Sequence, residues 1–138
     1  GSKVIHAAPN TTSTVNSKSI SKDGGVSIYR GLLSSTKNAV NSKSSVSCES
    51  LMLDSKSRSD TIPVINVCNN NVDIGHEAKI GRISEEAIFY LMSRGLTEEE
   101  AKGMVVTGFV EPIAKELPLE YAVEMNNLIK IELKGTIG

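Results

Sequence analysis

Apolar and polar residues alternate with a period of two in the first 80 residues, which is typical of β-strands. The longest alternating run covers residues 72–80, with Val72, Ile74, His76, Ala78 and Ile80 on one parity and Asp73, Gly75, Glu77 and Lys79 on the other. Shorter runs contain Val26 and Ile28, and Val46 and Cys48. The pattern predicts short strands over residues 3 to about 83. In the run 72–80, the side chains on the parity of His76 are expected to face a packed interior.

Turn-forming residues separate these runs, at Pro9-Asn10, at Asp23-Gly24-Gly25, and at residues 54–57 and 69–71. Widely spaced short strands suit a sandwich, a barrel or a β-solenoid. In a solenoid, small polar residues can stack in rows from coil to coil while Val and Ile fill the interior. Because the sequence shows no strict repeat, its pattern alone leaves these three architectures open.

The pattern changes to a helical period after residue 83. Ser84 can cap a first helix, with Ile88, Leu91 and Met92 as its apolar stripe and Gly95 as its stop. Thr97 and Glu100 form a capping box for a second helix. Its buried stripe is expected to be Ala101, Met104, Val105 and Phe109. Pro118 then begins a third helix, which presents Leu119, Ala122, Val123, Leu128 and Ile131 and ends at Gly135.

Composition changes at the same place. Ser, Thr and Asn make up 29 of the first 80 residues but 7 of the last 58, and the net charge changes from +3 to −4. We therefore expect two domains, residues 1–83 and 84–138, with Gly1 and Ser2 as an expression scar. The overall charge of −1 argues against binding to nucleic acid or membrane through bulk charge, and the absence of Trp disfavours a base-stacking surface.

Three side chains are candidates for chemistry. His76 and Glu77 are adjacent in the best strand pattern, and Cys48 lies in another strand; imidazole, carboxylate and thiolate can all bind iron. The alternatives are a core histidine, a surface glutamate and a small buried cysteine. Cys68, beside three asparagines, is expected to be incidental, and the spacing of His6, Cys48, Cys68 and His76 matches no zinc pattern.

Several enzyme classes have no signature here. No Walker-type phosphate loop or Ser/His/Asp order is present, and Glu98-Glu99-Glu100 is better explained as a solvated helix start than as a metal site. No apolar run could span a bilayer and no signal peptide is visible, so the expected location is the bacterial cytoplasm, or the plastid stroma if a transit peptide was removed.

A set of strings resembles the C-terminal part of the SufB/SufD family, the subunits of the SUF iron–sulfur cluster assembly system. They are residues 6–11 (HAAPNT), 29–31 (YRG), 48–51 (CESL), 59–63 (SDTIP), 76–78 (HEA), 83–101 (ISEEAIFYLMSRGLTEEEA), 108–124 (GFVEPIAKELPLEYAVE) and 133–138 (LKGTIG). Glu77 in the HEA string and the ending Thr136-Ile137-Gly138 favour the SufB branch over the SufD branch.

The resemblance implies a mixed β and α fold: the C-terminal coils of a right-handed parallel β-helix, followed by a small all-helical domain. It also implies a non-catalytic scaffold that pairs with SufD through its β-helix. The helical domain would bind SufC, an ABC-type ATPase that holds the ATP, and a cysteine desulfurase system would supply sulfur as persulfide.

The resemblance also assigns residues. Cys48 matches the family's interface cysteine, Glu77 the glutamate implicated with it, and His76 the adjacent histidine, so these three are candidate ligands of a transient iron–sulfur cluster. The candidate SufC-docking residues lie in the helical domain: Ser93, Arg94, Gly95, Glu98 and Phe109. The chain lacks the family's long upstream region, so no cluster is expected bound to this fragment alone.

The fragment itself is expected to self-associate. A cut through the solenoid upstream of residue 3 would leave a coil end uncovered, and such an end is a template for strand pairing. The simplest expected product is a two-fold homodimer that mimics the SufB–SufD pairing or covers the cut end. Three functional alternatives stay open: a SufD-type subunit, a pure docking module whose β part is a spacer, and a metal-dependent enzyme using His76, Glu77 and Cys48. The lack of a third carboxylate or histidine near His76 in the sequence weighs against the enzyme.

Overall fold

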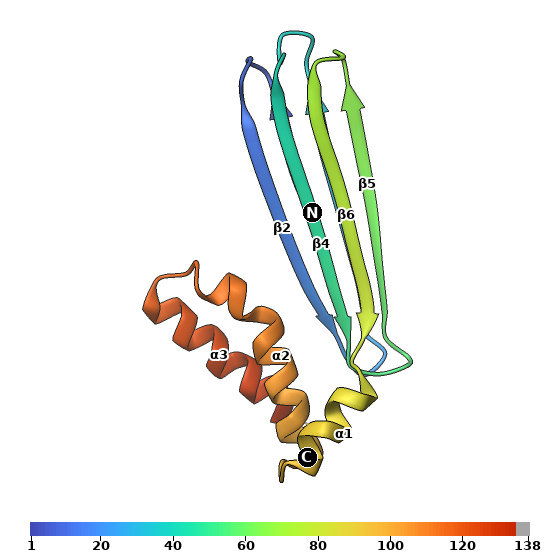
Figure 1. The fold of residues 1–138 in the computed structure, drawn as a ribbon, viewed down its shortest axis with the longest axis vertical. Coiled ribbons are helices and arrows are strands. Elements are labelled where there is room, and N and C mark those ends of the chain that lie inside the picture. The colour runs from blue at the N-terminus through green and yellow to red at the C-terminus, as the bar shows by residue number, and fades with distance from the viewer. Residues whose placement is uncertain (135–138) are drawn as a thin grey trace. The chain divides into compact units, whose positions relative to one another are not determined.

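The computed structural model describes residues 1–134 and divides the chain into two units, Gly1–Arg82 and Ile83–Gly138 (Figure 1). We call them the β unit and the helical unit. The β unit holds six strands: β1 (Ser2–His6), β2 (Thr12–Ser21), β3 (Val26–Ser35), β4 (Ser42–Met52), β5 (Arg58–Val67) and β6 (Val72–Arg82). The helical unit holds α1 (Glu85–Ser93), α2 (Glu98–Ala114) and α3 (Leu119–Lys134).

The six strands form two parallel sheets, ordered β1-β3-β5 and β2-β4-β6. Consecutive strands therefore alternate between the sheets, and each pair of strands is one coil of a solenoid. Thr12 pairs with Lys43 and Ser42 pairs with Val72 in one sheet, whereas Ser2 pairs with Gly31 and Val26 with Arg58 in the other, so equivalent positions recur every 29 to 32 residues. The predicted stacked coils of parallel strands followed by helices are confirmed.

Rows of hydroxyl groups tie one coil to the next, as the Ser- and Thr-rich composition suggested. The hydroxyl of Ser13 lies 2.8 Å from that of Ser44, and Ser19 and Ser50 repeat the contact at 2.8 Å. Thr11 and Ser42 form a similar pair at 2.9 Å. These pairs satisfy polar groups that would otherwise be buried without partners.

An asparagine row at one turn supplies the repeat that the sequence pattern did not reveal. Asn10 and Asn41 both have positive φ, 59° and 57°, a conformation that asparagine tolerates better than most residues. The Asn41 amide donates to the Asn10 side-chain oxygen at 2.7 Å, and the Asn41 main-chain N–H donates to the Asn71 carbonyl at 2.6 Å. Residues 10, 41 and 71 are therefore equivalent corners of successive coils.

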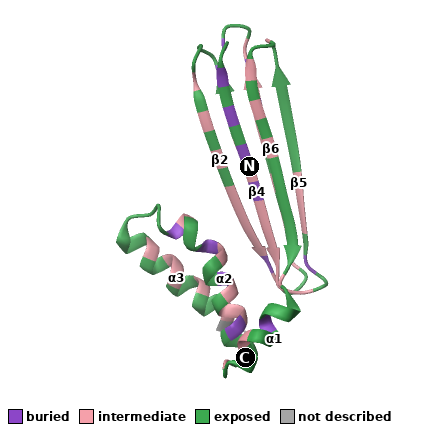
Figure 2. Ribbon diagram, viewed as in Figure 1, coloured by how far each residue is buried: buried purple, intermediate pink, exposed green. Residues whose placement is uncertain are grey.

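The interior between the sheets is narrow and holds hydroxyls beside apolar groups. Leu33, Val46 and Cys48 are buried, and so are Ser35, Ser42 and Ser44. Figure 2 shows buried positions alternating with exposed ones along β4. Val26 and Ile28, the apolar residues of one alternating run, lie on the outer face of β3 and are 62% and 50% exposed, because Tyr29 and Leu33 have the inward parity of this strand.

The last coil is less covered than the sequence predicted. Ile80 is 43% exposed and Ala78 is exposed, although both have the inward parity of β6. The reason is that β6 has β4 as its one neighbour within the described residues, so one side of the final coil carries no further layer.

The helix ends follow the sequence closely. The Ser84 hydroxyl accepts a hydrogen bond from the Ala87 N–H at 3.2 Å, and the Thr97–Glu100 capping box is complete. Gly95 has a φ of +98°, as a left-handed helix stop requires. Pro118 directly precedes α3, and its carbonyl accepts from the Ala122 N–H at 3.0 Å. The predicted stop at Gly135 lies outside the described residues.

The predicted helix stripes are partly wrong. The buried residues of α2 are Ala101, Val106, Val110 and Ala114, whereas Met104 is 54% exposed and Val105 and Phe109 are half-buried. On α1, Ile88 is buried but Met92 is 42% exposed. On α3, most of the predicted face is exposed: Leu119, Val123, Leu128 and Ile131. The half-buried residues of α3 are Ala122, which the prediction included, together with Met125, Asn126, Ile129 and Leu133. Within the described residues, no helix has the length and apolar character needed to cross a bilayer.

Candidate functional site

Cys48 and His76 come together on neighbouring strands. Val46 pairs with His76 and Cys48 with Ala78 in the parallel register of β4 and β6, so all four side chains have inward parity. The Cys48 Sγ lies 3.6 Å from the His76 Nε2, within hydrogen-bond reach of a sulfur atom. Cys48 is buried and His76 is half-buried. A thiol and an imidazole in contact can exchange a proton, and both are ligands that iron accepts.

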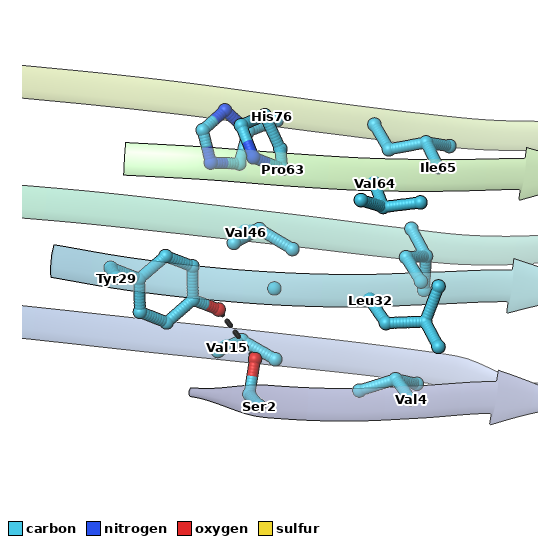
Figure 3. A pocket seen from close by; sticks show the side chains of 12 residues that line it. Ser2, Val4, Val15, Tyr29, Leu32, Val46, Pro63, Val64, Ile65 and His76 are labelled. Atoms are coloured by element: carbon cyan, nitrogen blue, oxygen red, sulfur yellow. Dashed lines mark hydrogen bonds between the residues drawn. The ribbon is translucent and has the colours of Figure 1, made fainter. Parts of the chain in front are cut away.

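A small cavity of about 10 Å³ lies beside this pair in the interior of the β unit, and His76 lines it. Its lining residues, drawn in Figure 3, come from both sheets: Val15, Val46 and His76 lie on β2, β4 and β6, and Tyr29 and Pro63 lie on β3 and β5. The volume is at the lower limit for a single water molecule. Cys48 is thus buried in the interior of the β unit, whereas the half-buried His76 also lines this small cavity.

Glu77 lies on the opposite face of the same sheet. Its carboxylate is 63% exposed and pairs with the Lys79 ammonium, with Oε1 and Nζ 3.1 Å apart. This placement agrees with the alternation in the sequence, which put Glu77 with Asp73 and Lys79. The structure thus brings Cys48 and His76 together and keeps Glu77 away from both, so one mononuclear metal ion cannot contact all three in this arrangement.

A row of charges crosses the outer face of the β2-β4-β6 sheet next to Glu77. Lys18, Glu49 and Lys79 occupy paired positions on the three strands, and Lys18 forms an ion pair with Glu49. The hydrogen bond from Lys18 lowers the pKa of Glu49, and the hydrogen bond with Glu77 raises the pKa of Lys79. Opposite charges on directly neighbouring strands stabilise the sheet register.

The other histidine and cysteine have separate positions. His6 is buried, with Nδ1 2.6 Å from the Thr11 hydroxyl and Nε2 2.9 Å from the Ser13 hydroxyl. Both ring nitrogens therefore form hydrogen bonds with hydroxyl groups of the rows described above. Cys68 is exposed just after β5. Over residues 1–134 no three His, Cys, Asp or Glu side chains gather as a metal site would require, and the four-residue zinc site is not formed.

The docking candidates of the helical unit cluster mainly where α1 ends. The Ser93 hydroxyl donates to the Tyr90 carbonyl at 2.6 Å, and the Arg94 guanidinium donates to the Tyr90 hydroxyl at 2.8 Å. Gly95 ends the helix, Glu98 pairs with Lys102 at 2.6 Å, and Phe109 is half-buried on α2. Arg94 therefore holds the Tyr90 side chain, whereas the Ser93 hydrogen bond is made to the Tyr90 main chain.

Sequence reasoning missed the most exposed aromatic residues of this region. Phe89 is 74% exposed and Tyr90 is 55% exposed, although both lie in the string ISEEAIFYLMSRG. The helical period was the available signal, because Ile88 and Leu91 occupy the inner stripe and leave residues 89 and 90 outside it. Exposed neighbouring aromatic residues are frequent at protein interfaces.

Comparison with known proteins decides the family. Residues 1–109 match the family profile of the SUF system FeS cluster assembly, SufBD core domain. The chain belongs to the SufBD family. It is 57% identical over 138 residues to an iron-sulfur cluster assembly SufBD family protein of Staphylococcus epidermidis, and 56% identical over 138 residues to the iron-sulfur cluster assembly protein SufB of Bacillus subtilis.

These alignments cover 100% of this chain but 30% of each relative. The chain thus spans less than a third of the length of the curated relatives that it matches. It is a SufB-like member of the SufBD family of iron–sulfur cluster assembly proteins, and the predicted family resemblance is confirmed.

Proposed function

We propose that the chain acts as the C-terminal part of a SufB-type scaffold, on which an iron–sulfur cluster is assembled as cargo before transfer. The observation that carries the proposal is the contact at 3.6 Å between the Cys48 thiol on β4 and the His76 imidazole on β6, which joins the last two coils. Thiolate and imidazole are the donor types that iron–sulfur clusters accept. Two such donors are fewer than the four ligands that hold a resident cluster, and a partial ligand set suits a site that must release its cluster.

The proposal places the remaining ligands outside this chain. Because Glu77 points away from Cys48, a site that uses Cys48, His76 and Glu77 together needs a rearranged β6. Without that rearrangement, the ligands beyond Cys48 and His76 must come from a second subunit. We propose SufD as that subunit, paired through the β unit. The strands β5 and β6 each have one strand neighbour within residues 1–134, so each has a free edge. Because β5 contains Pro63 and β6 contains no proline, β6 offers the more complete row of backbone N–H donors for pairing with a strand of SufD.

The helical unit is proposed to recruit the SufC ATPase. In support, Phe89 and Tyr90 are exposed on α1 and Arg94 holds Tyr90 through a hydrogen bond and a cation–π contact, with the guanidinium 5.1 Å from the ring centre. ATP binding and hydrolysis then belong to SufC, and the scaffold itself is non-catalytic. The proposed sulfur source is persulfide from a cysteine desulfurase system, and the proposed location is the bacterial cytoplasm.

Anaerobic reconstitution of the full-length protein with SufD and SufC tests the assembly role. Cys48→Ala and Glu77→Ala should each reduce the iron and sulfide bound per complex, whereas Cys68→Ala, the matched cysteine control, should bind as much as the unmodified complex. Visible absorption together with iron and sulfide analysis measures the result.

The same experiment separates the alternatives. A complex in which Cys48→Ala assembles clusters normally while loss of the helical unit abolishes SufC binding would support the pure docking module. A complex in which Cys68→Ala fails and Cys48→Ala succeeds would contradict the residue assignment.

A further inference from the structure

The Thr61 hydroxyl on β5 is a buried polar group without a partner. Its oxygen is shielded from solvent, and it forms no hydrogen bond in the part of the chain that the structure describes, residues 1–134. Buried hydroxyls of native folds are usually paired, because an unpaired one destabilises the fold. The Thr61 hydroxyl is therefore a candidate for a contact that forms only when the β unit holds a ligand.

Contacts between β4 and β5 show which side chain Thr61 faces. On either side of it the two strands meet through the hydrogen bond from Ser59 to Ser50, at 2.8 Å, and through Pro63 and Val46, which line one small cavity (Figure 3). Alternate residues of a strand share one face, so the inward position between these two contacts is Thr61 on β5 and Cys48 on β4. Thr61 therefore lies opposite Cys48 across the interior.

The surroundings of the Cys48 sulfur contain one hydrogen-bond partner among the described residues, the His76 Nε2 at 3.6 Å. The neighbours of Cys48 in its own inward row are Ser17 on β2 and Ala78 on β6. Of the Ser17 and Thr61 hydroxyls, only that of Thr61 is both fully buried and unpaired. A cluster-bound sulfur carries negative charge and accepts hydrogen bonds from its surroundings. Thr61 is thus placed to supply a donor that the empty site does not use.

We propose that Thr61 is a positioning residue of the cluster-assembly site, and that its hydroxyl donates a hydrogen bond to the Cys48 sulfur when that sulfur is a cluster ligand. This inference rests on the proposed function, because it names a further residue of the same site. The hydroxyl is unpaired in the empty fold and gains a partner in the occupied site. The bound cluster removes a destabilising feature of the empty fold, so Thr61 favours the occupied state.

Replacement of Thr61 by valine separates this role from a structural one. Thr61→Val exchanges the hydroxyl for a methyl group of similar size, so the full-length protein without cluster should unfold at the same temperature or at a higher one. In the complex with SufD and SufC, the same variant should lose its reconstituted cluster to a chelator about three to ten times faster, the range expected for one hydrogen bond. A purely structural threonine would not combine these two results.

The reduction potential of the bound cluster is a second readout. Hydrogen bonds to cluster sulfurs stabilise the reduced, more negative form, so Thr61→Val should lower the potential. Thr61→Ser keeps the hydroxyl and should restore both the potential and the rate of cluster loss. Thr14→Val is the matched control, because Thr14 is exposed on the outer face of β2 and its replacement should change neither quantity.

Several outcomes would contradict the inference. Equal rates of cluster loss for Thr61→Val and the unmodified complex would overturn it, and so would a lower unfolding temperature of Thr61→Val, which would show that the hydroxyl has a partner in the empty fold. A larger effect of Ser17→Ala than of Thr61→Val would assign the donor to Ser17 instead. Cys48→Ala distinguishes this inference from the proposed function, because normal cluster assembly in that variant would overturn both.

Discussion

The Tyr29 ring lies against Gly31, and this contact explains one of the strings that carried the family resemblance. A Cβ at Gly31 would lie 2.9 Å from the Tyr29 Cε1 and 2.9 Å from its hydroxyl oxygen. The ring would have to turn away, and its hydroxyl would lose the hydrogen bond to Ser2. Because Tyr29 also lines the interior cavity, the glycine preserves the packing beside His76.

The sequence predicted the directions of the candidate side chains but not the contact between them. Alternation placed His76 inward and Glu77 outward, as the structure has them. The contact between Cys48 and His76 depends on the register of β4 against β6, which joins residues 28 positions apart. No local pattern encodes that register, so the sequence could nominate both residues without showing that they touch.

Asp54 organises the turn between β4 and β5. Its carboxylate accepts from the Lys56 N–H at 2.7 Å and from the Ser57 N–H and hydroxyl, both at 2.8 Å. The hydroxyl of Ser57 is the main cause that lowers the pKa of Asp54 from 3.8 to about 2. The charged form is therefore favoured in the folded state.

This shift predicts a specific pH dependence. A carboxyl group whose pKa is lower when folded contributes stability above its unfolded pKa and loses that contribution as the pH falls through its folded pKa. The stability of the unmodified chain should thus fall between about pH 4 and pH 2, and Asp54→Asn should flatten this part of the curve. Urea unfolding at several pH values measures it.

Asp73→Asn is the control for that series. Asp73 is an exposed carboxylate on the outer face of β6 and makes no hydrogen bond within residues 1–134. Its replacement should leave the acid branch of the curve as steep as in the unmodified chain. An equally steep branch for Asp54→Asn would show that the turn does not cause the effect.

At the scale of elements, helix ends were easier to predict than helix faces. Ser84, Thr97 and Gly95 act through contacts within three or four residues, so the local sequence contains the whole signal. The inner stripe of α2 depends on where α1 and α3 pack, and this arrangement buries Val106 and Val110 in place of Met104 and Phe109. The strands show the same limit, since the alternation of Val26 and Ile28 indicated a strand without indicating that these two residues face outward.

The capping box of α2 gives a prediction at this scale. Thr97→Ala removes the acceptor for the Glu100 N–H and should lower the stability of the helical unit by about 1 kcal/mol. Thr107→Ala is the matched control, because its hydroxyl bonds to a carbonyl that is already in the helix ladder. Thermal unfolding followed by circular dichroism at the helix band should show a lower midpoint for Thr97→Ala than for Thr107→Ala.

For the whole molecule, the change of composition near residue 80 has a physical explanation. A solenoid coil with a narrow interior uses stacked hydroxyls and amides where a thicker core would use large apolar side chains, so the β unit is rich in Ser, Thr and Asn. The helical unit needs caps and charged faces instead, and its acidic residues lie largely in the first turns of its helices. Composition therefore predicted that the chain has a β part and a helical part, but it did not predict which residues of neighbouring coils contact one another.

The uncovered side of the final coil predicts self-association of this chain. There β5 and β6 present backbone groups without a strand neighbour inside the described residues, and the inward-parity residue Ile80 is 43% exposed. Backbone edges and apolar surface of this kind favour pairing with a second copy. We expect a two-fold homodimer held by strand-to-strand contacts, with a mass by light scattering that rises with protein concentration.

Two charge substitutions distinguish strand contacts from helix contacts. Ile80→Lys places a charge at the uncovered end of the β unit and should give a monomer at every concentration, because dimerisation would bury the ammonium group without a partner. Phe89→Lys changes an even more exposed apolar side chain on α1 and should leave the dimer intact. A monomeric mass for the unmodified chain throughout, or loss of the dimer in Phe89→Lys alone, would contradict association through the strands.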